Sequence, residues 1–181
     1  MTHYVALLRA INITTRSVKM EWLRALFAEM GLANVSTYIA SGNVLFDGDG
    51  AHAVLEERIE AHLAAALGFE VATFLRTPDE MTAIAARPPF AAADREAAFG
   101  LMVAFLKTQP GEAATARLLA HRSDSDDFAV HGREVYWLRR TQQSDTNFSG
   151  TRLERAVGMP ATVRSITTVR KLAELAQMSA S

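Results

Sequence analysis

The stretch Tyr4–Asn12 reads YVALLRAIN, and the part before its arginine is apolar at every position. Successive side chains of a strand point to opposite faces of the sheet, so this strand is apolar on both faces. A sheet with helices on one face and water on the other should alternate apolar with polar residues. Residues 101–106, LMVAFL, do not alternate either. We therefore expect two sheets that are covered on both faces, by the other half of the chain or by a second copy.

Outward from this stretch, the expected elements follow the order βαββαβ of a ferredoxin-like unit. Helical spacing of apolar residues begins behind a candidate N-cap at Ser17, and Gly31 ends that helix. Two strands flank a turn at 41–43, and Gly68 ends a second helix. The elements expected in the first half are a strand at 5–9, a helix at 18–30, strands at 35–39 and 44–46, a helix at 54–67 and a strand at 71–76.

The order then repeats. Thr77-Pro78-Asp79-Glu80 predicts a capping box and a short helix, and 91–98 is expected to be a linker. The elements expected beyond it are a strand at 101–107, a helix at 112–121, strands at 128–131 and 134–138, a helix at 151–157, a strand at 162–164 and a helix at 168–178. No residue identity relates the two parts, so the duplication rests on element order. The sequence predicts an α+β protein of two fused ferredoxin-like halves, 1–90 and 91–181, the second with a C-terminal helix.

Composition limits the classes of partner. The 181 residues suffice for a substantial core, and 19 basic against 20 acidic residues give a net charge of −1. Overall charge therefore attracts neither nucleic acid nor a membrane surface. The absence of cysteine excludes disulfides, thiol catalysis and cysteine-bound metals. No apolar run approaches the roughly 20 residues that span a bilayer. We expect a cytoplasmic protein without membrane or nucleic-acid partners, and a homodimer remains open.

One edge of the first sheet is the candidate site. In a ferredoxin-like unit the first two strands run parallel with the third between them, so the end of the first strand, the start of the first helix and the turn at 41–43 converge. A helix start offers free N–H groups and a positive dipole, which suits phosphate or carboxylate. The alternative is that these residues only cap a helix, form a turn and carry solvated charges. The residues concerned are Arg9, Asn12, Ser17, Lys19, Ser41, Gly42 and Asn43.

The same motifs, YVALLRAIN and TYIASGNVLF, resemble the bacterial domain-of-unknown-function family 1697. The family has glycine where this chain has Ala10, so the loop is not expected to adopt positive φ freely, and close backbone approach to a ligand is in question. Ser165-Ile166 replaces a family Asn-Trp. Arg164 either joins the same cluster or pairs with a carboxylate. The matching positions are Tyr4, Leu7, Leu8, Arg9, Ile11, Asn12, Lys19, Met20, Thr37, Tyr38, Ser41, Gly42, Asn43, Thr162, Arg164, Thr168 and Val169.

Other chemistry has weaker signals. The five histidines show no metal-binding spacing and no neighbouring carboxylate, so they are expected to be structural or surface residues. Asp124, Asp126 and Asp127 could hold magnesium, but a turn is the preferred interpretation. The polar loop 139–147 has donors for a ligand, though a solvated loop is preferred. No nucleotide-binding or serine-hydrolase motif is present, and no cofactor is predicted.

Three functions remain open. The first is binding of a small anionic or nucleotide-like ligand at the edge formed by Arg9, Lys19, Ser41 and Asn43. The second is a hydrolase or transferase that uses the same edge, but the clustered segments contain no histidine, aspartate or glutamate to act as a general base. The third is a weak nucleic-acid binder, which the charge balance disfavours. Whether the protein is an enzyme therefore stays open.

Overall fold

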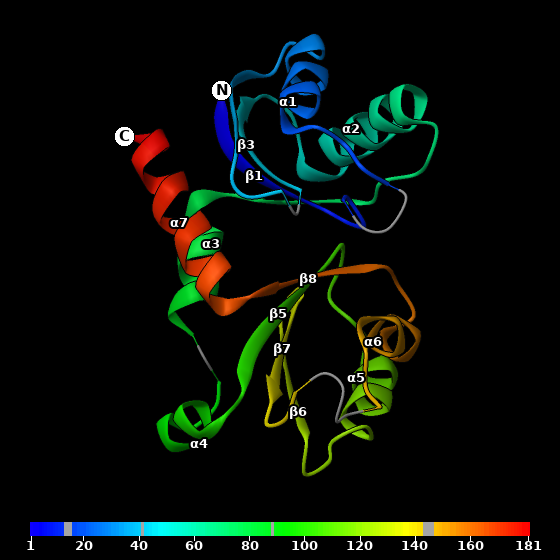
Figure 1. Cartoon of the computed structure of the whole chain (residues 1–181), viewed down its shortest axis with the longest axis vertical. Coiled ribbons are helices and arrows are strands. Elements are labelled where there is room, and N and C mark those ends of the chain that lie inside the picture. Colours follow the sequence, from blue (N-terminus) through cyan, green and yellow to red (C-terminus); the bar gives the residue numbers. More distant parts are fainter. Residues whose placement is uncertain (13–15, 41, 88, 143–146) are drawn as a thin grey trace. The chain divides into compact units, whose positions relative to one another are not determined.

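Two four-stranded antiparallel sheets of the same topology form the fold (Figure 1). The structure, a computed structural model, describes residues 1–12, 16–40, 42–87, 89–142 and 147–181. Strands follow the order β2-β3-β1-β4 in the first sheet and β6-β7-β5-β8 in the second. In both, the first strand of the half lies between the third and the fourth, as in a ferredoxin-like unit. The predicted fold class, two fused α+β halves, is confirmed.

The first half contains every element that was expected from its sequence. Its elements are β1 (Thr2–Leu8), α1 (Met20–Glu29), β2 (Ala33–Thr37), β3 (Asn43–Gly48), α2 (His52–Leu67), β4 (Thr73–Arg76) and α3 (Pro78–Ala86). The short helix α4 (Ala92–Ala97) connects it in sequence to the second half. The helix α4 corrects the prediction of a linker at 91–98. Alanine favours helix, and Asp94 in its first turn and Arg95 in its last turn suit the helix dipole.

The second half repeats this order. Its elements are β5 (Gly100–Leu106), α5 (Glu112–Leu119), β6 (Asp126–His131), β7 (Glu134–Arg139), α6 (Gly150–Val157), β8 (Ala161–Ser165) and α7 (Ile166–Ala180). In Figure 1, α1 and α2 lie on one side of the first sheet, and α5 and α6 lie on one side of the second.

Both faces of the central strand of each sheet are buried. Tyr4, Ala6 and Leu8 pack in the core beneath α1 and α2. Val5 and Leu7, on the opposite face of β1, have no exposed surface either. The second sheet is buried in the same way. The core on its helix side includes Phe128, Trp137, Phe148 and Leu153. The buried residues of the other face include Val103, Phe105, Tyr136 and Leu138. The prediction from the unbroken apolar pattern therefore holds for both central strands.

The strand registers align the two halves residue by residue. Leu7 pairs with the first residue of β3, and Phe105 pairs with the first residue of β7. Leu8 N–H donates to Gly42 O at 2.8 Å, and Leu106 N–H donates to Arg133 O at 2.9 Å. Residues 4–9, YVALLR, thus align with 102–107, MVAFLK. The expectation that the halves share no residue identity is wrong for this strand, and the repeat is visible in sequence once the register is known.

The repeat extends to the last strands and to the helices that follow them. Val5 pairs with Arg76 and Val103 pairs with Arg164, so the two buried arginines occupy equivalent positions. A hydroxyl residue follows each arginine and accepts the N–H three residues on, Thr77 from Glu80 at 3.2 Å and Ser165 from Thr168 at 3.3 Å. Thus α7 is the counterpart of α3, and the repeating unit is βαββαβα.

By packing, the chain divides into two compact units, Met1–Thr82 with Lys171–Ser181, and Ala83–Arg170. The predicted division at 90/91 placed the whole C-terminal helix with the second half. Instead, α7 from Lys171 onward belongs to the first unit, where the amide of Gln177 donates to Asp79 Oδ1 at 3.1 Å and Thr82 Oγ1 at 3.2 Å. The last helix is therefore the final element of the second repeat in sequence, but it packs with the first unit.

Carboxylates cover the outer edges of β4 and β8. Glu60 Oε1 accepts Thr73 N–H at 2.8 Å, and Glu154 Oε1 accepts the equivalent Ala161 N–H at 3.0 Å. In the first half a second carboxylate, Glu56, also accepts Leu75 N–H at 2.9 Å. Unpaired edge strands invite pairing with other chains, and acceptors placed on their N–H groups block it.

Replacing Glu56 by alanine should destabilise the first unit by about 1–3 kcal/mol, because Leu75 N–H would lose its acceptor in a buried place. Urea unfolding followed by circular dichroism measures the loss. Glu57→Ala is the matched control, since Glu57 is the next residue of α2 and is exposed. Equal stabilities of the two variants would contradict this role of Glu56.

Candidate functional site

The two connections that were expected to carry a site meet at one edge of the first sheet. Leu8 N–H donates to Gly42 O at 2.8 Å, which joins the end of β1 to the β2–β3 turn. The side chain of Asn12 adds two bonds, donating from Nδ2 to Ala40 O at 2.5 Å and accepting Val18 N–H on Oδ1 at 2.6 Å. Asn12 thus ties the β1–α1 connection to the turn and to the start of α1.

The helix α1 begins later than expected. Its N-cap is Lys19, not Ser17, with an extended backbone (φ −67°, ψ 135°) and no side-chain capping bond. The reason lies in Val18, whose side chain is buried and whose N–H is bonded to Asn12, so the chain stays extended past Ser17. The first turn of α1 therefore has an exposed lysine and no capping side chain.

Among the described residues of this edge, three other than glycine have a backbone in the left-handed region. Ala10 has φ 59°, Asn12 has φ 57° and Ile39 has φ 51°. The expectation that the loop would avoid positive φ without a glycine at position 10 is wrong. Asparagine tolerates this conformation, but alanine and isoleucine are strained by about 1–2 kcal/mol each. Strain of this kind is concentrated at functional sites, where the surrounding structure enforces it.

Gly42 and Asn43 shape the turn. Gly42 has φ 84°, and a Cβ there would lie 3.1 Å from Leu8 Cβ and 3.2 Å from Ile11 Cβ, so no larger residue fits without displacement. Asn43 has no exposed surface, and its Nδ2 donates to Tyr38 O at 3.0 Å. Both residues hold the turn against β1. Ser41, also predicted here, lies outside the described residues.

The predicted cations differ in their surroundings. Arg9 is half-buried, and its backbone N–H donates to Ala72 O at 2.9 Å. Lys19 is exposed. Arg16 lies with Cζ 5.0 Å from the centre of the Phe69 ring. Of the cations predicted at this edge, Lys19 is therefore exposed, Arg9 is half-buried and Arg16 is stacked on an aromatic ring.

Arg164 belongs to the second unit and is engaged within its own strand. Its Nη1 donates to Thr162 Oγ1 at 2.7 Å and to Val163 O at 3.0 Å. Burial lowers the pKa of Arg164 to about 10. These contacts hold the Arg164 side chain along β8, at the position equivalent to Arg76.

At the corresponding edge of the second half, both connections are shorter. Eleven residues, 9–19, connect β1 to α1, whereas five residues, 107–111, connect β5 to α5. Five residues, 38–42, join β2 to β3, whereas two residues, 132–133, join β6 to β7. Because the halves share strand order and register, the extra length is not needed to build the fold.

Three histidines of the first unit have carboxylate partners, so the expectation of none is wrong. These partners are distant in sequence, so neighbouring residues give no sign of them. Burial alone would raise the pKa of Asp47, but hydrogen bonds from Asn34 and His3 and nearby positive charge lower it below its ordinary value of 3.8. The pairs are His3 Nδ1 with Asp47 Oδ1 at 2.5 Å, His62 Nε2 with Glu29 Oε2 at 3.0 Å and His52 Nε2 with Glu80 Oε2 at 3.4 Å.

The acidic run at 124–127 is only partly a turn: Asp124 lies in the bend before β6, whereas Asp126 and Asp127 are the first two residues of that strand. Asp126 Oδ1 accepts the indole N–H of Trp137 at 2.7 Å, and Asp127 Oδ1 accepts Arg122 Nε at 2.8 Å. Two of its carboxylates thus have structural partners. Within the described residues, no group of three or more histidine, cysteine, aspartate or glutamate side chains is placed to hold a metal ion. The polar loop 139–147 is only partly described, since 143–146 lie outside the described residues.

The fold and register define a protein of two ferredoxin-like repeats, and comparison with known proteins gives its family. The chain belongs to the family described as a protein of unknown function, DUF1697, whose model matches residues 1–136. It is similar in structure to the conserved bacterial protein SP0830 from Streptococcus pneumoniae, with a TM-score of 0.73, 22% identity and coverage of 98% of this chain and 99% of that one. At this identity the likeness shows the fold alone. No curated protein matches the chain.

None of the described helices combines the length and the apolar character needed to cross a membrane.

Replacing Ala10 by glycine should stabilise the protein by about 0.5–1 kcal/mol. Relief of the left-handed strain of about 1–2 kcal/mol is partly offset by the greater freedom of glycine in the unfolded chain. Thermal and urea unfolding measure the change. Ala28→Gly, in the exposed face of α1, is the control and should destabilise by about 1 kcal/mol. A loss of stability in Ala10→Gly would show that this alanine is not strained.

Proposed function

We propose that the protein binds a small anionic ligand, a phosphate or a nucleotide-like molecule, at the edge of the first sheet. The observation that carries this function is the lengthening of both connections at that edge relative to their counterparts in the second half. Long connections held by a rigid scaffold are where binding residues concentrate. The second half provides an internal reference, because the same sheet is completed there with shorter connections.

The chemistry of the edge favours an anion. Arg9 and Lys19 supply positive charge, and the first turn of α1 has N–H groups that no side chain caps. Asn12 fixes the spacing of the two connections before any ligand arrives, which lowers the entropy lost on binding. Gly42 and Asn43 contribute by shaping the turn. Binding at this edge does not require Arg164.

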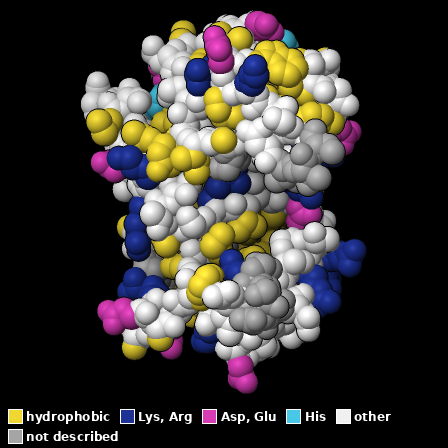
Figure 2. Space-filling view, in the orientation of Figure 1, with side chains coloured by type: hydrophobic (Ala, Val, Ile, Leu, Met, Phe, Trp, Pro, Cys, Tyr) yellow, Lys and Arg dark blue, Asp and Glu magenta, His cyan; other side chains and the backbone are white. Residues whose placement is uncertain are grey.

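Binding is preferred to catalysis and to nucleic-acid recognition. Residues 9–12, 16–19 and 38–43 contain no histidine, aspartate or glutamate, so a general base would have to come from outside these segments, as from Glu21 in the first turn of α1. Nucleic-acid binding through charge needs a basic surface. The net charge is −1, and acidic and basic side chains are mixed on the face shown in Figure 2.

Titration calorimetry with pyrophosphate and with AMP tests this function. The double variant Arg9→Ala/Lys19→Ala should weaken binding about tenfold or more, because contacts from charged groups contribute about 1.5–3 kcal/mol each. Lys107→Ala is the matched control, since Lys107 is the counterpart of Arg9 in the second half, and it should leave the affinity unchanged.

Two results would contradict binding at this edge. One is the absence of saturable binding of either probe to the unmodified chain. The other is a loss of affinity in Lys107→Ala as large as in the double variant. Release of phosphate from pyrophosphate during the titration, abolished by the double variant, would instead support the hydrolase that shares this edge.

A further inference from the structure

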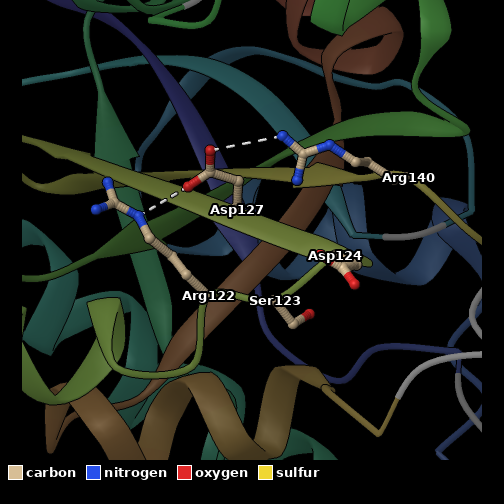
Figure 3. Close-up of a pocket in the computed structure, with 5 residues that line it drawn as sticks. All are labelled: Arg122, Ser123, Asp124, Asp127 and Arg140. Atoms are coloured by element: carbon tan, nitrogen blue, oxygen red, sulfur yellow. Dashed lines mark hydrogen bonds and ion pairs between the residues drawn. The ribbon is translucent and has the colours of Figure 1, made fainter.

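A hollow of about 460 Å³ opens on the second unit, where the turn before β6 meets the end of β7. Its walls are polar and carry both signs of charge (Figure 3). The lining residues are Arg122, Ser123, Asp124, Asp127 and Arg140. None of them belongs to the edge discussed above, so the hollow is an independent feature of the chain.

The walls of the hollow are held by hydrogen bonds of the Ser123 hydroxyl and of the backbone. Ser123 Oγ accepts Ser125 N–H at 3.1 Å and Asp126 N–H at 3.2 Å, and Ser123 N–H donates to Asp126 O at 2.9 Å. Arg140 N–H donates to Ser125 O at 2.8 Å, which ties the turn to the end of β7. The charged side chains therefore project from a fixed frame.

Arg122 and Asp127 form an ion pair within the hollow. Arg122 Nε donates to Asp127 Oδ1 at 2.8 Å, and Arg122 Nη2 donates to Phe128 O at 2.9 Å. This pair forms one wall, and its opposite charges compensate each other.

Two further charges are only partly used. Arg140 Nη2 lies 3.8 Å from Asp127 Oδ2, which is beyond hydrogen-bond distance. Its guanidinium therefore keeps donors for another group. Asp124 is exposed, and it has no hydrogen bond or ion pair with any residue in the described ranges. Asp127 is thus shared by Arg122 and Arg140, so the hollow presents one guanidinium that can still donate to a further carboxylate and one exposed carboxylate, Asp124.

We infer that this hollow binds a small zwitterion of the amino-acid class, with its carboxylate on Arg140 and its ammonium on Asp124. A guanidinium pairs well with a carboxylate through two parallel hydrogen bonds. A simple anion would satisfy Arg140 but face the carboxylate of Asp124, and a simple cation would meet the reverse conflict. A ligand with both charges compensates both residues. Because the site is open to solvent, its affinity is in the millimolar range.

Titration of the isotope-labelled full chain, followed by amide resonances, tests this site. Glycine, β-alanine and 4-aminobutyrate vary the distance between the two charges, and acetate and methylammonium carry one charge each. At least one amino acid should shift the resonances of residues 122–127 and 140 saturably and bind about tenfold more tightly than either single-charge probe. Arg140→Gln and Asp124→Asn should each weaken that binding about tenfold.

Arg155→Gln and Asp94→Asn serve as controls, since both residues are exposed in the same unit and outside the hollow, and they should leave the affinity unchanged. Acetate or inorganic phosphate binding as tightly as the amino acids would overturn the inference. So would the absence of saturable shifts, or unchanged affinity in both hollow variants.

Discussion

Burial of both faces of β1 and β5 is the constraint on which the rest of the structure depends. These central strands are apolar at successive positions, so neither face can lie in water without losing about 25 cal/mol for each Å² of apolar surface left exposed. Helices α1 and α2, and their counterparts α5 and α6, cover one face of each sheet. Charged groups are consequently excluded from most of the sheet surface. Chemistry is left to the ends of the strands and to the connections between them.

The repeat shows which features the fold requires and which are additions. Both halves keep a buried arginine in the last strand, a hydroxyl cap on the following helix and a carboxylate on the edge strand. Aligning Glu60 with Glu154 makes Gly150 the counterpart of Glu56. Gly150 has no side chain to accept the N–H of Val163, which is the counterpart of Leu75 and lies beside it. The first half alone lengthens both connections at one edge. A feature found in one half only is not required by the shared fold, so this edge is the preferred place for a ligand.

Much of the fold could be predicted from local patterns. The unbroken apolar strands, the helix ends at Gly31 and Gly68 and the capping box at 77–80 each depend on neighbouring residues, and each is present. The prediction of a linker at 91–98 was wrong because the alanines of this segment favour a helix. The match between 4–9 and 102–107 was missed because it becomes evident only from the strand registers.

The details of the site were harder to predict, because they depend on contacts between distant residues. The position of the α1 cap is set by the bond from Val18 to Asn12, and the positive φ of Ala10 is imposed by the loop around it. The carboxylate partners of the histidines are also distant in sequence. Convergence of the two connections at one edge could be predicted, since it follows from strand order. Their lengthening relative to the second half could be recognised only once the halves were aligned.

The central claim is that the first half carries an anion site that the second half lacks. Crystals soaked with tungstate, a heavy analogue of phosphate, test it most directly, because anomalous scattering locates the ion without ambiguity. We expect a peak beside Arg9 and Lys19, and none at the equivalent edge formed by 107–111. A peak at that second edge, or no peak at the first edge when it is free of lattice contacts, would contradict it.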